Sequence, residues 1–319
     1  MKLSFFDFHS DTASELYHGK KSLLSNDLHV SLENASVYER YAQVFAVFTS
    51  ARLSDEEGWQ AFLKISDFFR KELANHSDRI GSATHAGDLD RLWRNGRCAA
   101  FLAVEDARLL ANDQKRLSTL YDLGVRFLTL TWAGETCIGG SWDTQSGLTD
   151  FGKQVVADCF RYGIVPDISH ASEETIDDAL ALAFDAGKSI IATHSNAHAV
   201  YGHNRNLRDR HFASIRDLGG VVGMNMYRSH LSDHAVSPAT LETVFSHIDH
   251  FMSLGGENTV VFGSDFDGAT FPDALKNLAS IADIAEVLLR HNYPEALIRK
   301  IFWENAVAFL HRTLPETNL

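Results

Sequence analysis

The sequence contains few cysteines and no long hydrophobic run. Its three cysteines, Cys98, Cys137 and Cys159, are odd in number and far apart, and none belongs to a CxxC pair. This spacing argues against a disulfide framework or a cysteine metal site, and for reduced thiols in a reducing compartment. No stretch approaches 18 apolar residues, and the opening residues MKLSFFDFHSDT turn polar too early for a signal peptide. We therefore expect a cytoplasmic protein with no membrane partner.

Positive charge is also scarce. Lys and Arg number 29 against 42 Asp and Glu, which gives a formal net charge of -13 at pH 7. No run of basic residues gathers the positive charge into one patch, so the protein would repel a polyanion. Nucleic acid is therefore not an expected partner.

Apolar residues, in contrast, are numerous enough for a large core. Hydrophobic residues make up 45% and charged residues 22% of the 319 residues, with only five prolines, a composition that excludes disorder and low complexity. The length fits two domains of about 150 residues or one α/β barrel of about 250. No Pro-, Gly- or Ser-rich linker divides the chain, which favours one domain over residues 1–319.

Short apolar runs typical of β-strands recur along the chain, with longer helical patterns between them. The runs lie at 3–9, 43–49, 98–105, 125–132, 163–170, 189–194, 220–226 and 259–265. The segments 56–76, 173–187 and 241–256 carry apolar residues at three- and four-residue steps, as amphipathic helices do.

These strands are apolar on both faces, as expected of a parallel sheet covered by helices. Eight strand–helix alternations predict closure into a (β/α)8 TIM-type barrel of the α/β class, with an open doubly wound sheet as the main alternative. A C-terminal helix at 294–312 is expected to pack outside the barrel.

Polar residues able to bind a metal fall at the ends of the predicted strands, where barrel active sites lie. They are His9, Asp11, Glu105, His170, His194 and Asp265. His9 and Asp11 are two residues apart, so both project to one side of a strand and can bind one ion together. Each residue alone could be a buried or solvated strand end, but their joint position predicts a metal site.

Three histidines and two carboxylates are too many for one open tetrahedral zinc site, which usually takes three protein ligands. They suit two ions about 3.5–4 Å apart. Glu105 is the natural bridge, because its two carboxylate oxygens can each face one ion. Imidazole and oxygen ligands without thiolate favour Zn²⁺, with Mn²⁺, Co²⁺ or Fe²⁺ as alternatives.

Five segments resemble the membrane (renal-type) dipeptidases, peptidase family M19, within the amidohydrolase-like metal-dependent barrels. They are FDFHSDT (6–12), LAVEDA (102–107), PDISHAS (166–172), ATHSNAHAVYGHNRNL (192–207) and FGSDFDG (262–268). Their order and spacing agree with the family over roughly residues 5–312.

The resemblance implies a binuclear zinc (β/α)8 barrel in which His9 and Asp11 hold one ion, His170 and His194 hold the other, and Glu105 bridges them. It also implies three roles around the substrate. Arg205 would meet a substrate carboxylate, Asp265 would act as the acid/base, and Tyr227 would contact the substrate.

Two positions depart from the family pattern. The usual opening DGHND reads Asp7-Phe8-His9-Ser10-Asp11 here, which keeps both ligands. Trp132 stands where renal-type members have a histidine that helps polarise the scissile carbonyl. An indole N–H donates one hydrogen bond but carries no charge, so this exchange bears on substrate specificity.

The resulting hypothesis is a soluble bacterial-type dipeptidase with two Zn²⁺ per chain. A metal-bridging hydroxide would attack a dipeptide with an L- or a D-residue at its C-terminal position, and the active enzyme would be a homodimer. A related amide or lactone hydrolase on the same barrel and a non-catalytic binding protein are the alternatives. His198, His203 and Asp267 are given no role, and His247 is expected on a partly exposed helix face.

Overall fold

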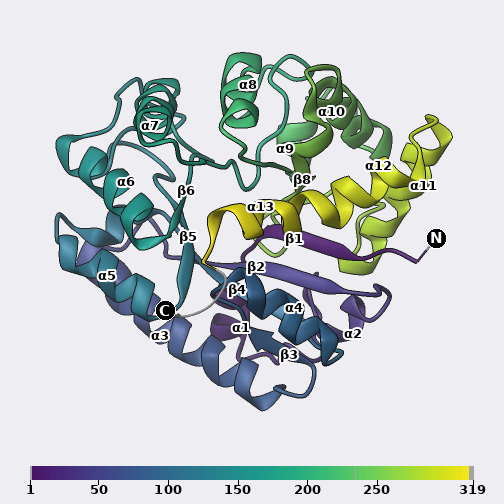
Figure 1. Cartoon of the computed structure of the whole chain (residues 1–319), viewed down its shortest axis with the longest axis horizontal. Coiled ribbons are helices and arrows are strands. Elements are labelled where there is room, and N and C mark those ends of the chain that lie inside the picture. Colours follow the sequence, from purple (N-terminus) through teal and green to yellow (C-terminus); the bar gives the residue numbers. More distant parts are fainter. Residues whose placement is uncertain (1, 234, 316–319) are drawn as a thin grey trace.

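The computed structural model describes residues 2–233 and 235–315 and contains a curled parallel sheet surrounded by helices (Figure 1). Seven of its strands lie side by side in the order β6-β5-β4-β2-β1-β8-β7. The strands are β1 Phe5–Ser10, β2 Tyr41–Phe48, β4 Cys98–Glu105, β5 Val125–Thr129, β6 Val165–Asp167, β7 Val222–Met224 and β8 Val260–Phe262.

The ring closes through the segment 190–192. Ile191 forms a parallel bridge with Asp167 of β6, and Ala192 forms one with Val222 of β7. The predicted strand at 189–194 is therefore present only as two isolated bridges, but it occupies its expected place between β6 and β7. The prediction of a (β/α)8 barrel is confirmed, and the open doubly wound sheet is wrong.

One strand was not expected from the sequence. β3, Ile80–Ser82, pairs in parallel with the beginning of β4, outside the ring. Its three residues, Ile-Gly-Ser, are too short to show an apolar alternation, so only the pairing with β4 makes them a strand.

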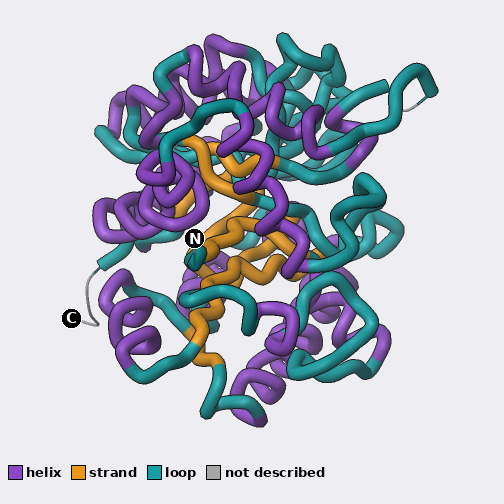
Figure 2. The backbone as a smooth tube through the Cα atoms, turned by 90° about the vertical axis from the view of Figure 1, so that its right-hand side faces the viewer, coloured by secondary structure: helices purple, strands orange, loops and turns teal. Residues whose placement is uncertain are grey.

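Helices form a layer around the strands, as Figure 2 shows from the side. Their bounds are α1 Thr12–Gly19, α2 Leu32–Ala35, α3 Asp55–Asn75, α4 Ala86–Arg94, α5 Gln114–Asp122, α6 Asp150–Tyr162, α7 Glu173–Ala186, α8 Asp209–Asp217, α9 Arg228–Leu231, α10 Leu241–Ser253, α11 Ala282–Arg290, α12 Glu295–Arg299 and α13 Asn305–Thr313. The three helices predicted from periodicity correspond to α3, α7 and α10. Ser54 begins α3 with a capping box to Glu57, and Gly187 ends α7 with a positive φ of 60°. Within the described residues, no helix has the length and apolarity to cross a membrane.

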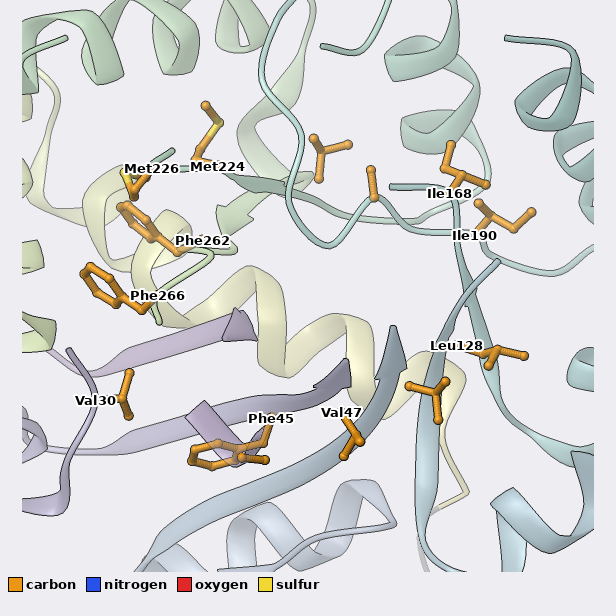
Figure 3. Close-up of a cluster of buried hydrophobic side chains, with 14 of the residues drawn as sticks. Val30, Phe45, Val47, Leu128, Ile168, Ile190, Met224, Met226, Phe262 and Phe266 are labelled. Atoms are coloured by element: carbon orange, nitrogen blue, oxygen red, sulfur yellow. The ribbon is translucent and has the colours of Figure 1, made fainter. Parts of the chain in front are cut away.

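The apolar core has two layers, separated by the strands. The outer layer lies between strands and helices and includes Phe45, Val47, Leu128 and Phe262 (Figure 3). The inner layer fills the interior of the barrel, where aromatic side chains from non-adjacent strands are in contact. Phe8 of β1 lies 5.8 Å from Phe127 of β5 between ring centroids, although β2 and β4 separate these strands in the sheet.

The C-terminal helix closes one end of this inner layer. Phe309 of α13 lies 6.0 Å from Phe8, and Trp303 lies 6.2 Å from Phe6. The same buried cluster contains the first residues of several strands, among them Ala42 and Ala99, which places α13 at the amino-terminal end of the ring. The helix predicted at 294–312 thus lies outside the strands, but across an opening of the barrel and not in the surrounding layer (Figure 1).

Replacing Phe309 with alanine should lower the free energy of unfolding by about 3–5 kcal/mol, because it leaves a cavity beside Phe8. Urea denaturation followed by circular dichroism measures this change. Phe184→Ala on α7 is the matched control, since that ring is 77% exposed. Equal stability losses in both variants would contradict an interior role for α13.

Candidate active site

A cavity of about 740 Å³ opens at the carboxyl ends of the barrel strands. Seven of the nine residues that the sequence analysis selected line it: Asp11, Glu105, Trp132, His170, Arg205, Tyr227 and Asp265. The other two, His9 and His194, are buried and lie beside Glu105. The structure therefore brings all the selected residues together.

The Glu105 carboxylate faces three histidines, with one oxygen turned to each side. Its Oε2 lies 3.5 Å from Nε2 of His9. Its Oε1 lies 3.0 Å from Nε2 of His170 and 3.6 Å from Nε2 of His194. One oxygen thus faces His9 and the other faces the His170–His194 pair, which is the arrangement expected of a bridging carboxylate.

Two further carboxylates complete the His9 side. Asp11 Oδ2 lies 3.7 Å and Asp265 Oδ1 lies 4.0 Å from Nε2 of His9. On the other side, Nε2 of His170 and Nε2 of His194 are 2.8 Å apart. Two groups, His9–Glu105–His194 and His9–Asp11–Asp265, each place three potential ligand atoms within 4.8 Å of one another.

The loops that carry these residues are held in uncommon backbone conformations. His170 has a φ of 69° and Asp265 a φ of 65°, in the left-handed region that non-glycine residues rarely adopt. Gly268 allows Asp11 to approach, because a Cβ at this glycine would lie 1.9 Å from Asp11 Oδ2. Backbone strain of this kind is typical of functional sites, where the surrounding structure fixes the geometry.

A buried hydrogen-bond chain orients His194. Thr193 Oγ1 donates to Asp167 Oδ2 at 2.6 Å and lies 2.8 Å from Nδ1 of His194. Because that hydroxyl proton is directed to Asp167, its oxygen can accept from Nδ1–H of His194. This arrangement fixes the tautomer and leaves Nε2 as a lone-pair donor that faces Glu105.

Asp265 is oriented by a neighbouring amide. Asn225 donates from Nδ2 to Asp265 Oδ2 at 3.0 Å, and its Oδ1 accepts from the backbone N–H of Tyr227. Asp7 of β1 holds the residue that precedes Asp265, since its carboxylate accepts from both the backbone N–H and the hydroxyl of Ser264. These contacts tie the ends of β1, β7 and β8 together.

The buried side chains of this cluster have strongly shifted pKa values. Burial alone would lower the pKa of His9, but the carboxylates of Glu105 and Asp11 outweigh it and hold that pKa well above its usual value. Burial raises the pKa of Asp11 to about 8 and that of Asp265 to about 6. Burial is the main cause for both carboxyl groups, and the charge of the neighbouring Glu105 carboxylate adds to it.

Buried polar atoms without a hydrogen-bond partner indicate that this cluster can bind an ion. His9 Nε2 and Asp11 Oδ1, which both belong to the ligand cluster, have no hydrogen-bond partner among residues 2–233 and 235–315. Such atoms are costly to bury unless a ligand or ion satisfies them. The donor set of imidazole nitrogens and carboxylate oxygens fits divalent transition metals.

Arg205 offers a free guanidinium on the cavity wall. Its side chain is 6% exposed, and Nε and one terminal nitrogen have no hydrogen-bond partner in the described part of the chain. Burial lowers its pKa to about 10, so the group remains charged at neutral pH. An unpaired guanidinium of this kind can bind a carboxylate through two parallel hydrogen bonds.

The cavity wall also includes two ring side chains that sequence reasoning did not place at the site. His230 lies 4.5 Å from the Tyr227 ring and lines the cavity, as does Trp142. Neither residue ends a predicted strand, so no signal in the sequence marked them. Trp132 lies in the cavity wall, 4.9 Å from Phe48 and 6.0 Å from His170 between ring centroids.

Two of the remaining residues have structural roles. Asp267 accepts from Thr12 Oγ1 and from the backbone N–H of His29. His247 was expected on a partly exposed face, but this was wrong: its side chain is buried, and Nδ1 accepts from the backbone N–H of Ala197. The loop around Ala197 covers the helix face that periodicity alone left open.

The chain resembles several known proteins along most of its length. A metallo peptidase of Rhodobacter sphaeroides, solved with a phosphinate mimic of the dipeptide L-Ala-D-Ala, has a TM-score of 0.91 and 27% identity, and the alignment covers 98% of this chain and all of that one. A Klebsiella pneumoniae protein named for the pqqA 5′ region is 32% identical over 246 residues, 74% of this chain and 90% of that protein.

A third relative is the dipeptidase tcpJ of Claviceps purpurea. It is 28% identical over 249 residues, which span 76% of this chain and 58% of that protein. The model of the membrane dipeptidase family, peptidase family M19, matches residues 1–315. The chain therefore belongs to peptidase family M19.

Proposed function

We propose that the protein is a metal-dependent dipeptidase that hydrolyses the peptide bond of dipeptides. One observation carries this proposal: the Glu105 carboxylate lies between two sets of histidines, in the same cavity as the unpaired Arg205 guanidinium. The first feature suits a metal pair and the second suits the free carboxylate of a short peptide.

The metal would be held by residues from four places in the barrel. His9 and Asp11 would bind one Zn²⁺, His170 and His194 a second, and Glu105 both. When bound, zinc supplies Lewis-acid polarisation of the carbonyl and lowers the pKa of a water toward neutrality. Asp7, Asp167 and Thr193 would keep the ligands in place through the hydrogen bonds described above.

Asp265 would transfer the proton in this reaction. Its Oδ2 is occupied by Asn225 Nδ2, while Oδ1 faces the ligand cluster and can accept a proton from the attacking water. The same oxygen would then donate that proton to the leaving amine nitrogen. Arg205 would bind the substrate carboxylate, and Tyr227 and Trp132 would flank the substrate from the cavity wall.

Three further expectations stay predictions: one domain over residues 1–319, a homodimer, and a cytoplasmic location.

Purified protein should contain about two equivalents of zinc per chain, and chelation should abolish dipeptide hydrolysis because the ligand cluster then loses its cation. Elemental analysis and a panel of L-Xaa-L-Xaa and L-Xaa-D-Xaa dipeptides on one sample measure both properties. Addition of Zn²⁺ to the chelated protein should restore turnover. Protein that binds no metal and gains no activity from added Zn²⁺ would refute the proposal.

Replacing Asp265 with asparagine should keep the metal content and reduce kcat by about 10²–10⁴-fold, because the amide cannot take up the proton. Steady-state kinetics and metal analysis on the same preparation test this. Asp273→Asn, on the exposed loop after β8, is the control for loss of one carboxylate. A kcat near that of the unmodified enzyme would remove Asp265 from the proton transfer.

Replacing Arg205 with alanine should raise KM for dipeptides with a free carboxylate by roughly 10–100-fold, the effect of losing a charge-assisted hydrogen-bond pair. Amidated dipeptides should show little change. Arg208→Ala is the matched control, since Arg208 pairs with Glu173 outside the cavity. Equal losses on free and amidated substrates would show that Arg205 does not bind the carboxylate.

A further inference from the structure

One carboxylate in the cavity wall lies outside the ligand cluster and has no partner among the described residues. Five acidic residues line the cavity: Asp11, Glu15, Glu105, Asp265 and Asp267. Asp11, Glu105 and Asp265 surround His9, and Asp267 is occupied by Thr12 and His29. In the part of the chain that the structure describes, the side chain of Glu15 forms no hydrogen bond or ion pair, and it is only partly buried.

Helix α1 directs Glu15 toward the cavity. Asp11, Ser14, Glu15 and His18 all line it, and their spacing of three, four and seven residues places them on one helix face. Ser14 fixes this face against β2, since its hydroxyl donates to the backbone oxygen of Phe48 and accepts from the backbone N–H of the same residue.

The wall that carries Glu15 lies across the barrel from Arg205. Arg205 belongs to the loop that follows the segment 190–192, and Phe48 ends β2. In the ring, β2 is four positions from that segment in either direction, through β6, β5 and β4 or through β7, β8 and β1. A dipeptide whose carboxylate binds Arg205 would therefore extend its amino-terminal residue toward Phe48 and α1.

The surface beside Glu15 suits a long aliphatic side chain. The Phe48 and Trp132 rings pack 4.9 Å apart between centroids, and both line the cavity next to the α1 face. Lysine and arginine side chains commonly place their methylene stems on aromatic or apolar surfaces and direct the charged end to a polar partner. The Glu15 carboxylate is available as that partner.

We infer that Glu15 is a specificity-determining residue that selects dipeptides with a basic amino-terminal residue. The inference rests on the proposed dipeptidase activity and adds the substrate class. The Phe48 and Trp132 rings would hold the methylene stem, and Glu15 would bind the terminal cation. A charge-assisted contact of this kind corresponds to a preference of about tenfold or more in kcat/KM.

The test compares the zinc-loaded enzyme on lysyl-alanine and norleucyl-alanine, which share the unbranched stem and differ in the terminal cation. Each is tested with L- and D-alanine in the second position. The enzyme should prefer lysine by about tenfold in kcat/KM. Glu15→Gln should abolish this preference while changing norleucyl-alanine hydrolysis less than twofold, and Glu15→Lys should favour glutamyl-alanine.

Glu286→Gln, which removes an exposed carboxylate from α11, is the matched control and should keep the lysine preference. If Glu15→Gln lowers kcat/KM equally for the lysine and norleucine substrates, the inference is overturned. Glu15 would then contact the α-amino group, which both substrates share, or would stabilise α1. Absence of a lysine preference in the unmodified enzyme would overturn it as well. If the metal-loaded enzyme hydrolyses neither substrate, the proposed function itself is contradicted.

Discussion

The carboxylate of Glu105 is the group toward which three histidines from different parts of the barrel converge. Its position is fixed by the sheet, because Glu105 is the last residue of β4 and lies in register with Phe48 of β2 and Thr129 of β5. Neighbouring strands on both sides therefore hold the backbone of this residue. His9 is likewise held in a strand, β1, whereas His170 and His194 lie outside the regular strands. His170 has a positive φ, and the ring of His194 is oriented by Thr193. A carboxylate held by strands on both sides therefore gives the three imidazoles one fixed group to face.

Close backbone packing positions His194 in particular. A Cβ at Gly223 or at Gly263 would lie 1.8 or 1.7 Å from the backbone oxygen of Thr193, so only glycine fits at both places. The ends of β7 and β8 can thereby approach the segment that carries His194. The segment 189–194 forms isolated bridges and no regular ladder. Close backbone packing therefore completes the barrel here, beside the three-residue strands β6, β7 and β8.

Much of the site could be predicted because ligands in a barrel follow strand ends, and the strands here are marked by apolar runs. His9, Glu105 and His194 were found in this way. His230 and the buried His247 could not be found, because their positions depend on loops that fold back over the barrel. β3 was missed for a related reason: three residues carry no periodicity, and the pairing with β4 supplies what the local sequence lacks.

The interior core joins segments about 300 residues apart, since Phe6 and Phe8 of β1 pack on Trp303 and on Phe309 of α13. Contacts of such long sequence separation form late, because the intervening chain must be ordered first. During synthesis β1 is made long before α13, so the contacts of Phe6 and Phe8 with Trp303 and Phe309 can form only after α13 has left the ribosome. Apolar surface that stays open until then favours aggregation, and chaperone binding would limit it.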